Sequence, residues 1–269
     1  MNDEMYRLNI GDFQCTVVSD GYISVPTSLP GSGGASGSRP DHEIMDISCL
    51  VVRTQGENVL IDCGCGSGFQ DSAGKLAQNL DKAGINRHEI STIVFTHGHE
   101  DHVGGVFDRE GKPAYPNARY AVSRKEWECW EMKPETPMNE GLFASARKHL
   151  LGIRDRFDLL EDNAEVVPGI TLLPARGHTL GGVIIRIASG EDTLLCIGDL
   201  IHSQREFTRP DLYSFLDSDP EAAMKLRTDG LAEIGKSGAL VYACHFPFPG
   251  IGTFVKNEET LGWQPIQTN

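Results

Sequence analysis

A short cluster of metal-ligating side chains follows an apolar run near the middle of the chain. The run Ile93–Phe95 is typical of a buried strand, and the next residues include His97, His99, Asp101 and His102. Histidines separated by one residue project in the same direction from extended backbone. An Asp and a His after a turn can close around a second ion from the other side. Because neutral imidazole and carboxylate together suit Zn, Mn, Fe or Co, the string predicts a metal site at the end of a strand.

A histidine-rich loop that binds nothing is the alternative interpretation of the same residues. The zincin pattern H-E-x-x-H does not apply, because Glu100 follows His99 but the next histidine, His102, comes one residue too early. The following segment Val103–Val106 contains two glycines, which permit close backbone packing and a tight turn into a helix. Ligand candidates elsewhere in the chain decide between the two interpretations.

The H-x-H-x-D-H string followed by two glycines resembles the metal-binding motif of the metallo-beta-lactamase superfamily. The resemblance implies three further ligands, and each has a match in the family's order. They are His178 within a Gly-His-Thr motif, Asp199 after an apolar run, and His245 after Leu240–Cys244. One histidine after a strand is more often a hydrogen-bonded structural residue, whereas seven suitable ligands in order are a specific signal.

Shorter motifs resemble the branch of this superfamily that contains methyl parathion hydrolase and related lactonases. These motifs are Tyr115–Tyr120, Ser123–Trp130, Gly198–His202, Asp217–Pro220 and His245–Gly250. The resemblance extends from about residue 45 to residue 255. The flanking motifs suggest the branch but do not determine the substrate.

The resemblance implies an α/β fold, a four-layer αββα sandwich with the metals in a cleft at one edge of two sheets. One catalytic domain is expected to fill residues 1–269. The resemblance assigns seven ligands: His97, His99 and His178 to a first metal, Asp101, His102 and His245 to a second, and Asp199 to a bridge between them. Two divalent ions are therefore expected, zinc first, with Mn, Co or Fe as alternatives.

The implied chemistry is hydrolysis, because a water shared by two such ions can have its pKa lowered to about 7. No Ser or Cys nucleophile is then needed. Asp101 and Asp199 are predicted to orient this nucleophile and to carry its proton to the leaving group. Asp62, at a strand end, is either a hydrogen-bond partner for a ligand histidine or the cap of a turn.

Aromatic side chains and one further histidine are expected to meet the substrate. The implied fold places several aromatic residues near the cleft, and those expected to line it are Phe69, Trp130 and Phe246. His202, three residues beyond Asp199, is expected to hydrogen-bond an ester oxygen or the departing group, with a surface loop histidine as the alternative. An apolar wall fits a neutral ester or lactone better than a charged phosphate monoester.

Composition restricts the partners and the compartment. The formal net charge of -14 disfavours nucleic acid, because such binding depends on Lys and Arg displacing counterions. No apolar run approaches the roughly 18 residues that would span a bilayer. Residues 1–11 lack the charged and apolar regions of a signal peptide, which predicts a cytoplasmic protein. A homodimer is expected because relatives of this kind commonly dimerise.

The seven cysteines favour reduced, buried thiols over a disulfide framework, because their number is odd and most lie within apolar runs. The glycine- and serine-rich segment 29–40 is expected to be a flexible loop, either an inert insertion or a lid over the active site.

Alternating patterns predict nine strands and three helices. The expected strands are 13–19, 47–54, 58–62, 92–96, 119–123, 171–174, 182–188, 193–198 and 239–243. Helical spacing runs from Leu76 to Ala83, from Leu142 to Phe157 and from Ala223 to Ile234. Ser218 or Asp219 can cap the last helix, with Pro220 at its first position.

The leading hypothesis is a dinuclear metal-dependent hydrolase that opens a lactone or cleaves a related aryl ester. A phosphotriester (organophosphate) hydrolase is the alternative within hydrolases, because the same nucleophile can attack phosphorus. A mononuclear iron oxygenase of the persulfide dioxygenase type shares the fold and many ligand positions, and the identity and number of metals would distinguish it. A non-catalytic binding protein is a third class, but such proteins usually lose ligands and this chain keeps all seven.

Overall fold

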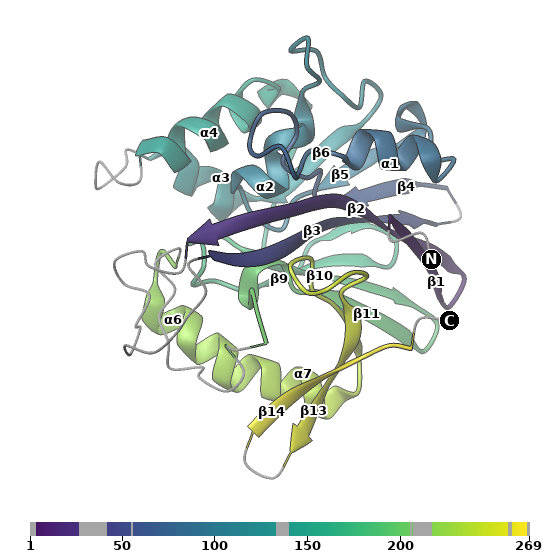
Figure 1. Cartoon of the computed structure of the whole chain (residues 1–269), viewed down its shortest axis with the longest axis vertical. Coiled ribbons are helices and arrows are strands. Elements are labelled where there is room, and N and C mark those ends of the chain that lie inside the picture. The colour runs from purple at the N-terminus through teal and green to yellow at the C-terminus, as the bar shows by residue number, and fades with distance from the viewer. Residues whose placement is uncertain are drawn as a thin grey trace.

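Two seven-stranded β-sheets lie face to face at the centre of the molecule, with helices on both outer faces (Figure 1). They are seen in a computed structural model that describes residues 4–26, 42–54, 56–132, 140–204, 206, 217–257 and 260–267. The predicted loop 29–40 lies outside the described residues. The arrangement confirms the four-layer αββα sandwich.

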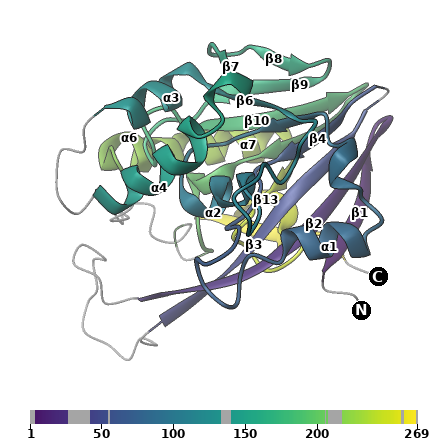
Figure 2. The ribbon, with the colours of Figure 1, turned by 90° about the horizontal axis from the view of Figure 1, so that it is seen from above.

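The first sheet follows the chain order. Its strands are β1 (Met5–Ile10), β2 (Phe13–Pro26), β3 (His42–Arg53), β4 (Asn58–Ile61), β5 (Thr92–Val94), β6 (Arg119–Ser123) and β7 (Phe157–Leu160). Neighbours are antiparallel from β1 to β4 and parallel from β4 to β7. The paired strands β2 and β3 are the longest in this sheet and extend side by side beyond it (Figure 2).

The second sheet has the order β14-β13-β12-β11-β10-β9-β8. Its strands are β8 (Glu165–Val167), β9 (Ile170–Pro174), β10 (Val183–Ser189), β11 (Asp192–Cys196), β12 (Leu240–Tyr242), β13 (Ile251–Asn257) and β14 (Thr260–Pro265). All its neighbours are antiparallel except β11 and β12, which are parallel.

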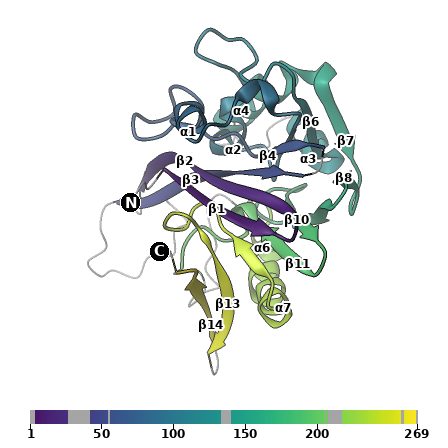
Figure 3. The same cartoon turned by 90° about the vertical axis from the view of Figure 1, so that its right-hand side faces the viewer.

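The helices divide between the two outer faces (Figure 3). The first sheet is covered by α1 (Leu76–Lys82), α2 (Glu100–Val103), α3 (Arg124–Glu131) and α4 (Glu140–Leu151), and the second by α6 (Pro220–Lys225), a π-helical turn (Leu226–Gly230) and α7 (Leu231–Ser237). Short 3-10 turns lie at Arg87–Glu89, Gly104–Val106, Arg154–Arg156 and Gly198–Leu200.

Central strands bury both faces, which explains their continuous apolar runs. In β3, Cys49 and Val51 pack toward the helices, whereas Leu50 and Val52 pack against the second sheet. This division follows from the alternation of side chains along a strand. The apolar runs therefore serve cores both between the sheets and beneath each helical layer.

All nine predicted strands are present, whereas β1, β7, β8, β13 and β14 were not predicted. Four of these five lie at the edges of the sheets, where fewer neighbours bury the side chains and the apolar pattern is weaker. The helix predicted to reach Phe157 is wrong at its end, because α4 stops at Leu151. Phe157 instead begins β7, pairs with Tyr120 and packs its ring on Trp127.

The start of α6 confirms the predicted cap. The side chain of Asp219 accepts a hydrogen bond from the amide of Ala222, and Pro220 occupies the first turn. All seven cysteines are free and buried, as predicted. Among the described helices, none is long and apolar enough to cross a membrane.

Two backbone segments approach each other closely beneath the predicted ligand string. The amide of Cys63 donates to the carbonyl of His102, and the amide of Gly105 donates to the carbonyl of Gly64. A β-carbon at Gly105 would lie 1.9 Å from the carbonyl oxygen of Cys63. The two glycines after the ligand string therefore allow close backbone packing, as the sequence predicted.

We expect Gly105→Ala to lower the free energy of unfolding by about 1–3 kcal/mol, because the added methyl group forces one segment to move. Thermal unfolding would show this as a fall in Tm of about 2–4 °C for each kcal/mol. Gly56→Ala is the matched control, because a β-carbon there meets no atom within 4 Å. An unchanged Tm for Gly105→Ala would contradict the steric argument.

Candidate metal centre

The predicted ligands come together at one edge of the sandwich. His97 and His99 follow β5, Asp199 follows β11, and His245 follows β12. These strands belong to the parallel parts of the two sheets, so their carboxyl ends point to a common edge. The amide of Val183 donates to the carbonyl of Thr96 across this edge, which links the two sheets at the site.

A first group of potential ligands contains His97, His99, His178 and Asp199, with one donor atom of each within 4.8 Å of the others. The Nδ1 atom of His99 lies 3.1 Å from Nε2 of His97 and 2.9 Å from Nε2 of His178. Burial holds the pKa of both His97 and His99 well below the ordinary value. These imidazoles are therefore neutral, which is the form that binds metal.

A second group contains His102, Asp199, Cys244 and His245. The Nε2 atoms of His102 and His245 are buried and have no hydrogen-bond partner of good geometry within the described residues. Each lies 3.0 Å from Oδ1 of Asp199. Buried polar atoms without a partner carry a free-energy penalty, and a cation beside Asp199 would satisfy both nitrogens. The donor set thus fits a metal ion.

Asp199 belongs to both groups and presents one oxygen to each. Its Oδ2 faces the first group, 3.6 Å from Nε2 of His97 and 3.3 Å from Nε2 of His178. Its Oδ1 faces His102 and His245. A carboxylate in this position can bridge two ions.

Asp101 lies beside the second group. Its Oδ2 is 3.7 Å from Nε2 of His102 and 3.5 Å from Nε2 of His245. Its side chain is 14% exposed, against 4% for Asp199, so Asp101 is the more accessible of the two predicted catalytic carboxylates.

Cys244 is a member of the second group that the sequence indicated only as a buried thiol. Its Sγ lies 3.8 Å from Oδ1 of Asp199. Burial raises the pKa of the Cys244 thiol to about 11, so the protonated sulfur donates toward the carboxylate. In this form the thiol helps to hold the carboxylate of Asp199 in place.

Outer hydrogen bonds orient the ligand imidazoles, as is usual in metal sites. His97 Nδ1 lies 3.1 Å from the hydroxyl of Thr96, and His245 Nδ1 donates to the backbone carbonyl of Asp46 at 3.0 Å. The Thr96 hydroxyl in turn donates to Asp62. Each bond leaves Nε2 of its histidine facing the centre.

Asp62 performs both roles that the sequence left open. One oxygen accepts a hydrogen bond from His102 Nδ1 at 2.8 Å. The other accepts from the amide of Thr96, which holds the turn after β5 in place. Asp62 itself has a positive φ of 56°, a conformation that Asp adopts more readily than most residues.

Asp217 and Arg227 form a further support that the sequence did not reveal as a pair. His178 Nδ1 donates to Asp217 at 3.3 Å, and both terminal nitrogens of Arg227 donate to the same carboxylate at 2.8 Å. Hydrogen bonds from His178 and Arg227 outweigh the effect of burial and lower the pKa of Asp217 to about 2. The sequence signal that could have indicated this pair is Arg227, a charged residue within the apolar helical pattern from Ala223 to Ile234.

The predicted substrate contacts lie in different environments. Phe69 is 39% exposed on the loop between β4 and α1. His202 Nε2 lies 3.3 Å from Oδ2 of Asp199, and its Nδ1 lies 3.3 Å from Glu206. Trp130 and Phe246 are 3% and 1% exposed, so they offer little surface to a ligand.

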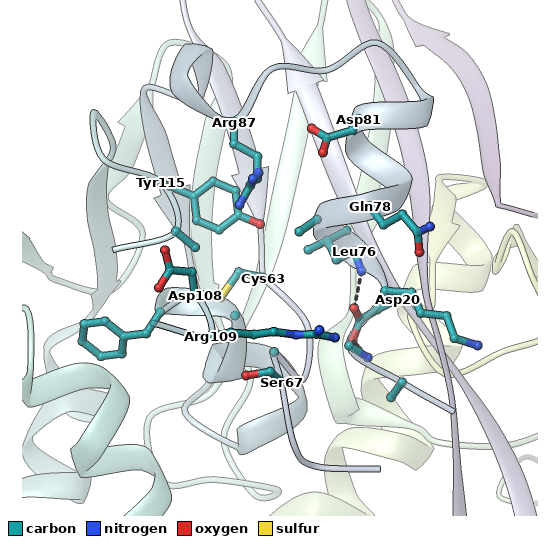
Figure 4. A pocket seen from close by; sticks show the side chains of 18 of the residues that line it. Asp20, Cys63, Ser67, Leu76, Gln78, Asp81, Arg87, Asp108, Arg109 and Tyr115 are labelled. Carbon is teal, nitrogen blue, oxygen red and sulfur yellow. Dashed lines mark hydrogen bonds between the residues drawn. The ribbon is translucent and has the colours of Figure 1, made fainter. Parts of the chain in front are cut away.

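A hollow of about 620 Å³ lies next to the β4–α1 loop and contains none of the seven predicted ligands (Figure 4). Asp20 in its wall is fully buried and accepts hydrogen bonds from the amides of Leu76, Cys65 and Gly74, at 2.6, 2.8 and 3.2 Å. These bonds fix both ends of the loop that carries Phe69.

An αββα sandwich with two buried histidine–carboxylate groups at its edge defines a class of protein, the metal-dependent hydrolases of this fold. Comparison with known families agrees. The sequence model of the metallo-beta-lactamase superfamily matches residues 43–245, which is most of the chain. The chain therefore belongs to the metallo-beta-lactamase superfamily.

Individual relatives match two thirds of the chain in sequence and nearly all of it in structure. The N-acyl homoserine lactonase AiiA of Bacillus thuringiensis subsp. kurstaki is 24% identical over 201 residues, 67% of this chain and 73% of the relative. The dizinc quorum-quenching lactonase AidC, solved with its product N-hexanoyl-L-homoserine, is 25% identical with a TM-score of 0.91, covering 99% of this chain and 98% of the other. The hydrolase AbOPH has a TM-score of 0.89 at 25% identity, covering 99% and 98%.

Proposed function

We propose that this protein is a dinuclear, zinc-dependent lactonase, with N-acyl homoserine lactones as the first substrate class to test. The observation that carries the proposal is the position of Asp199, which presents one carboxylate oxygen to each of two buried ligand groups. Similarity to AiiA and AidC supports the substrate class, since both are named as lactonases and AidC as a dizinc enzyme.

We assign the first ion to His97, His99 and His178, the second to Asp101, His102 and His245, and the bridge to Asp199. Ions bound there would supply a Lewis acid for the carbonyl oxygen and lower the pKa of water to about 7. Histidine and carboxylate donors suit zinc, and also Mn, Co and Fe.

Two residues are proposed to act on the substrate itself. Asp101, the more exposed carboxylate, would accept the proton of the attacking water and pass it to the departing alkoxide. Nε2 of His202 lies 3.3 Å from Oδ2 of Asp199, and its ring stacks on that of His245 with centroids 5.8 Å apart. From there Nε2 could donate a hydrogen bond to the ester oxygens.

Phe69 is proposed to supply the apolar surface for the acyl group, because it is exposed on a loop whose ends are fixed. Trp130 and Phe246 are proposed to support the site from the core. The chain is proposed to act as one catalytic domain, in a homodimer.

Two other reactions remain as alternatives. A phosphotriester hydrolase would use the same ligands, because the same nucleophile attacks phosphorus. A mononuclear iron oxygenase would need one ion, and the sharing of Asp199 between two groups favours the dinuclear centre.

The test is proton release by purified protein reconstituted with Zn, Mn or Co, measured on N-acyl homoserine lactones and aromatic fused lactones. We expect turnover that depends on the metal and disappears with a chelator. The variant His202→Ala should lower kcat while its metal content stays unchanged, because His202 is proposed to contact substrate and not metal.

Failure on every lactone would contradict the proposal and direct the assay to phosphotriesters and aryl esters. One bound iron per chain would instead favour the oxygenase. Full kcat in His202→Ala would exclude the proposed hydrogen bond to the substrate and leave the lactonase assignment intact.

A further inference from the structure

A buried carboxylate on α3 accepts four hydrogen bonds close to the metal centre. Oε1 of Glu126 accepts from the amide of Gly98 at 2.8 Å and from the indole nitrogen of Trp130 at 2.7 Å. Oε2 accepts from the hydroxyl of Thr179 at 2.7 Å and from the amide of Gly181 at 3.1 Å. The side chain is fully buried. A carboxylate that receives four donors is held in one orientation.

These four donors belong to the parts of the chain that carry the first group of ligands. Gly98 lies between His97 and His99, and Thr179 directly follows His178. The two ligand loops are separated by about eighty positions in the sequence, yet both donate hydrogen bonds to the carboxylate of Glu126. Glu126 therefore joins the two ligand loops through a single side chain that is not itself a predicted ligand.

The backbone of both loops packs tightly against α3. A β-carbon at Gly181 would lie 1.9 Å from the amide nitrogen of Glu126. A β-carbon at Gly98 would lie 2.3 Å from Nε1 of Trp130. Both glycines thus let the ligand loops reach the carboxylate, and small shifts of Glu126 must be passed to them.

Trp130 extends the same support to a ligand ring. Its indole nitrogen is held by Glu126, and its ring lies edge-on to that of His99 with centroids 5.6 Å apart. His99 faces the centre with Nδ1, and the Glu126–Trp130 pair packs against its ring.

We propose that Glu126 is a positioning residue for the first ion, setting the spacing of His97, His99 and His178 without contacting the metal. Its four hydrogen bonds go to the loops of that group and to Trp130, whereas His102 and His245 of the second group are held by other partners, Asp62 and the carbonyl of Asp46. The inference rests on the part of the proposed function that places an ion at His97, His99 and His178, and not on the second ion or on the identity of the substrate.

Glu126→Gln separates position from bulk, because the two side chains have nearly the same shape. The amide group of glutamine would replace one oxygen with a donor. If it faced Gly98 and Trp130, both would lose their acceptor. If it faced Thr179 and Gly181, the hydroxyl could turn to accept, but the amide of Gly181 could not. Either way the backbone N–H of Gly98 or of Gly181, both in ligand loops, is left opposing another donor.

The experiment titrates metal-free protein with Zn and Co and obtains both dissociation constants by competition with a chelator. We expect Glu126→Gln to weaken one binding step by about 10- to 100-fold, as for loss of an outer partner of a metal ligand, and to leave the other step unchanged. The visible absorption of the affected cobalt ion should change, because that spectrum reports ligand geometry. Glu128→Gln, exposed on the same helix, is the matched control and should match the wild type.

Thermal unfolding of the metal-free variants separates positioning from general damage. If Glu126→Gln does not fold, Thr179→Val removes a single donor and should weaken the same step to a smaller degree. Wild-type constants and spectrum in the variant would overturn the proposal, and so would equal weakening of both steps with a lowered Tm. A wild-type chain that takes up one ion would overturn only the dinuclear function, because the Glu126 comparison needs only the ion held by the first group.

Discussion

Replacing Asp199 by alanine is expected to remove most of the activity and much of the bound metal. Its two oxygens face opposite ligand groups, so the change takes one donor from each ion at once. Loss of an outer partner of a metal ligand already lowers affinity or activity by about 10- to 100-fold. Loss of a shared ligand should exceed the upper end of that range.

The measurement combines metal analysis by mass spectrometry with kcat for the best lactone. Asp155→Ala is a suitable control, because this aspartate is exposed in the short turn Arg154–Arg156, which contains none of the predicted ligands. If the Asp199→Ala protein kept two ions per chain and full turnover, the proposal that Asp199 bridges the two ions would be contradicted.

Replacing Arg227 by methionine is expected to destabilise the fold by about 3–5 kcal/mol. Arg227 is buried and donates two hydrogen bonds to Asp217, and removing one partner of a buried pair leaves the other charge uncompensated. In thermal unfolding of the metal-free protein, Tm should fall by about 2–4 °C for each kcal/mol. Metal-free protein is used because bound ions would add their own stabilisation.

The pH dependence of this loss has a definite sign. The folded pKa of Asp217 is about 2, below its ordinary value of 3.8, so its stabilising contribution is fully present above pH 3.8. The contribution is lost as the pH falls through the folded value. The difference in unfolding free energy between wild type and Arg227→Met should therefore shrink between pH 4 and pH 2.

A neighbouring ion pair provides the control. Lys225 and Asp229 also form a pair, at 2.6 Å, but both side chains are largely exposed. Exposed pairs contribute about 0–1 kcal/mol, so Lys225→Met should leave Tm nearly unchanged. Equal Tm values for the Arg227 and Lys225 variants would show that the buried pair does not stabilise the fold, and a difference that grew on acidification would contradict the role of Asp217.

The candidate centre was largely predictable because its ligands lie in short sequence motifs. Each motif follows a strand-like run, and the spacing of residues within a string such as His97 to His102 can be recognised without knowing the tertiary structure. Strands buried on both faces, such as β3, have apolar residues at every position and are easily recognised. Edge strands lack this signal, which is why β1, β7, β8 and β14 were missed.

Supports of the centre could not be predicted in the same way, because they depend on pairs far apart in the chain. Asp217 meets His178, and Glu126 meets Gly98 and Thr179, only after the sheets and helices have packed. A carboxylate at such a position has no local pattern that marks it.

The sequence alone therefore indicated the candidate ligands and their order through short motifs, and its resemblance to the metallo-beta-lactamase superfamily implied the αββα class, while the alternation of apolar residues located the central strands. Tertiary packing decided which acidic side chains serve the centre. Glu126 and Glu128 lie two positions apart on α3 and are chemically identical, but at about 100° per residue they point to nearly opposite sides of the helix. Only the position of α3 against the ligand loops buries Glu126 among four donors and leaves Glu128 in water.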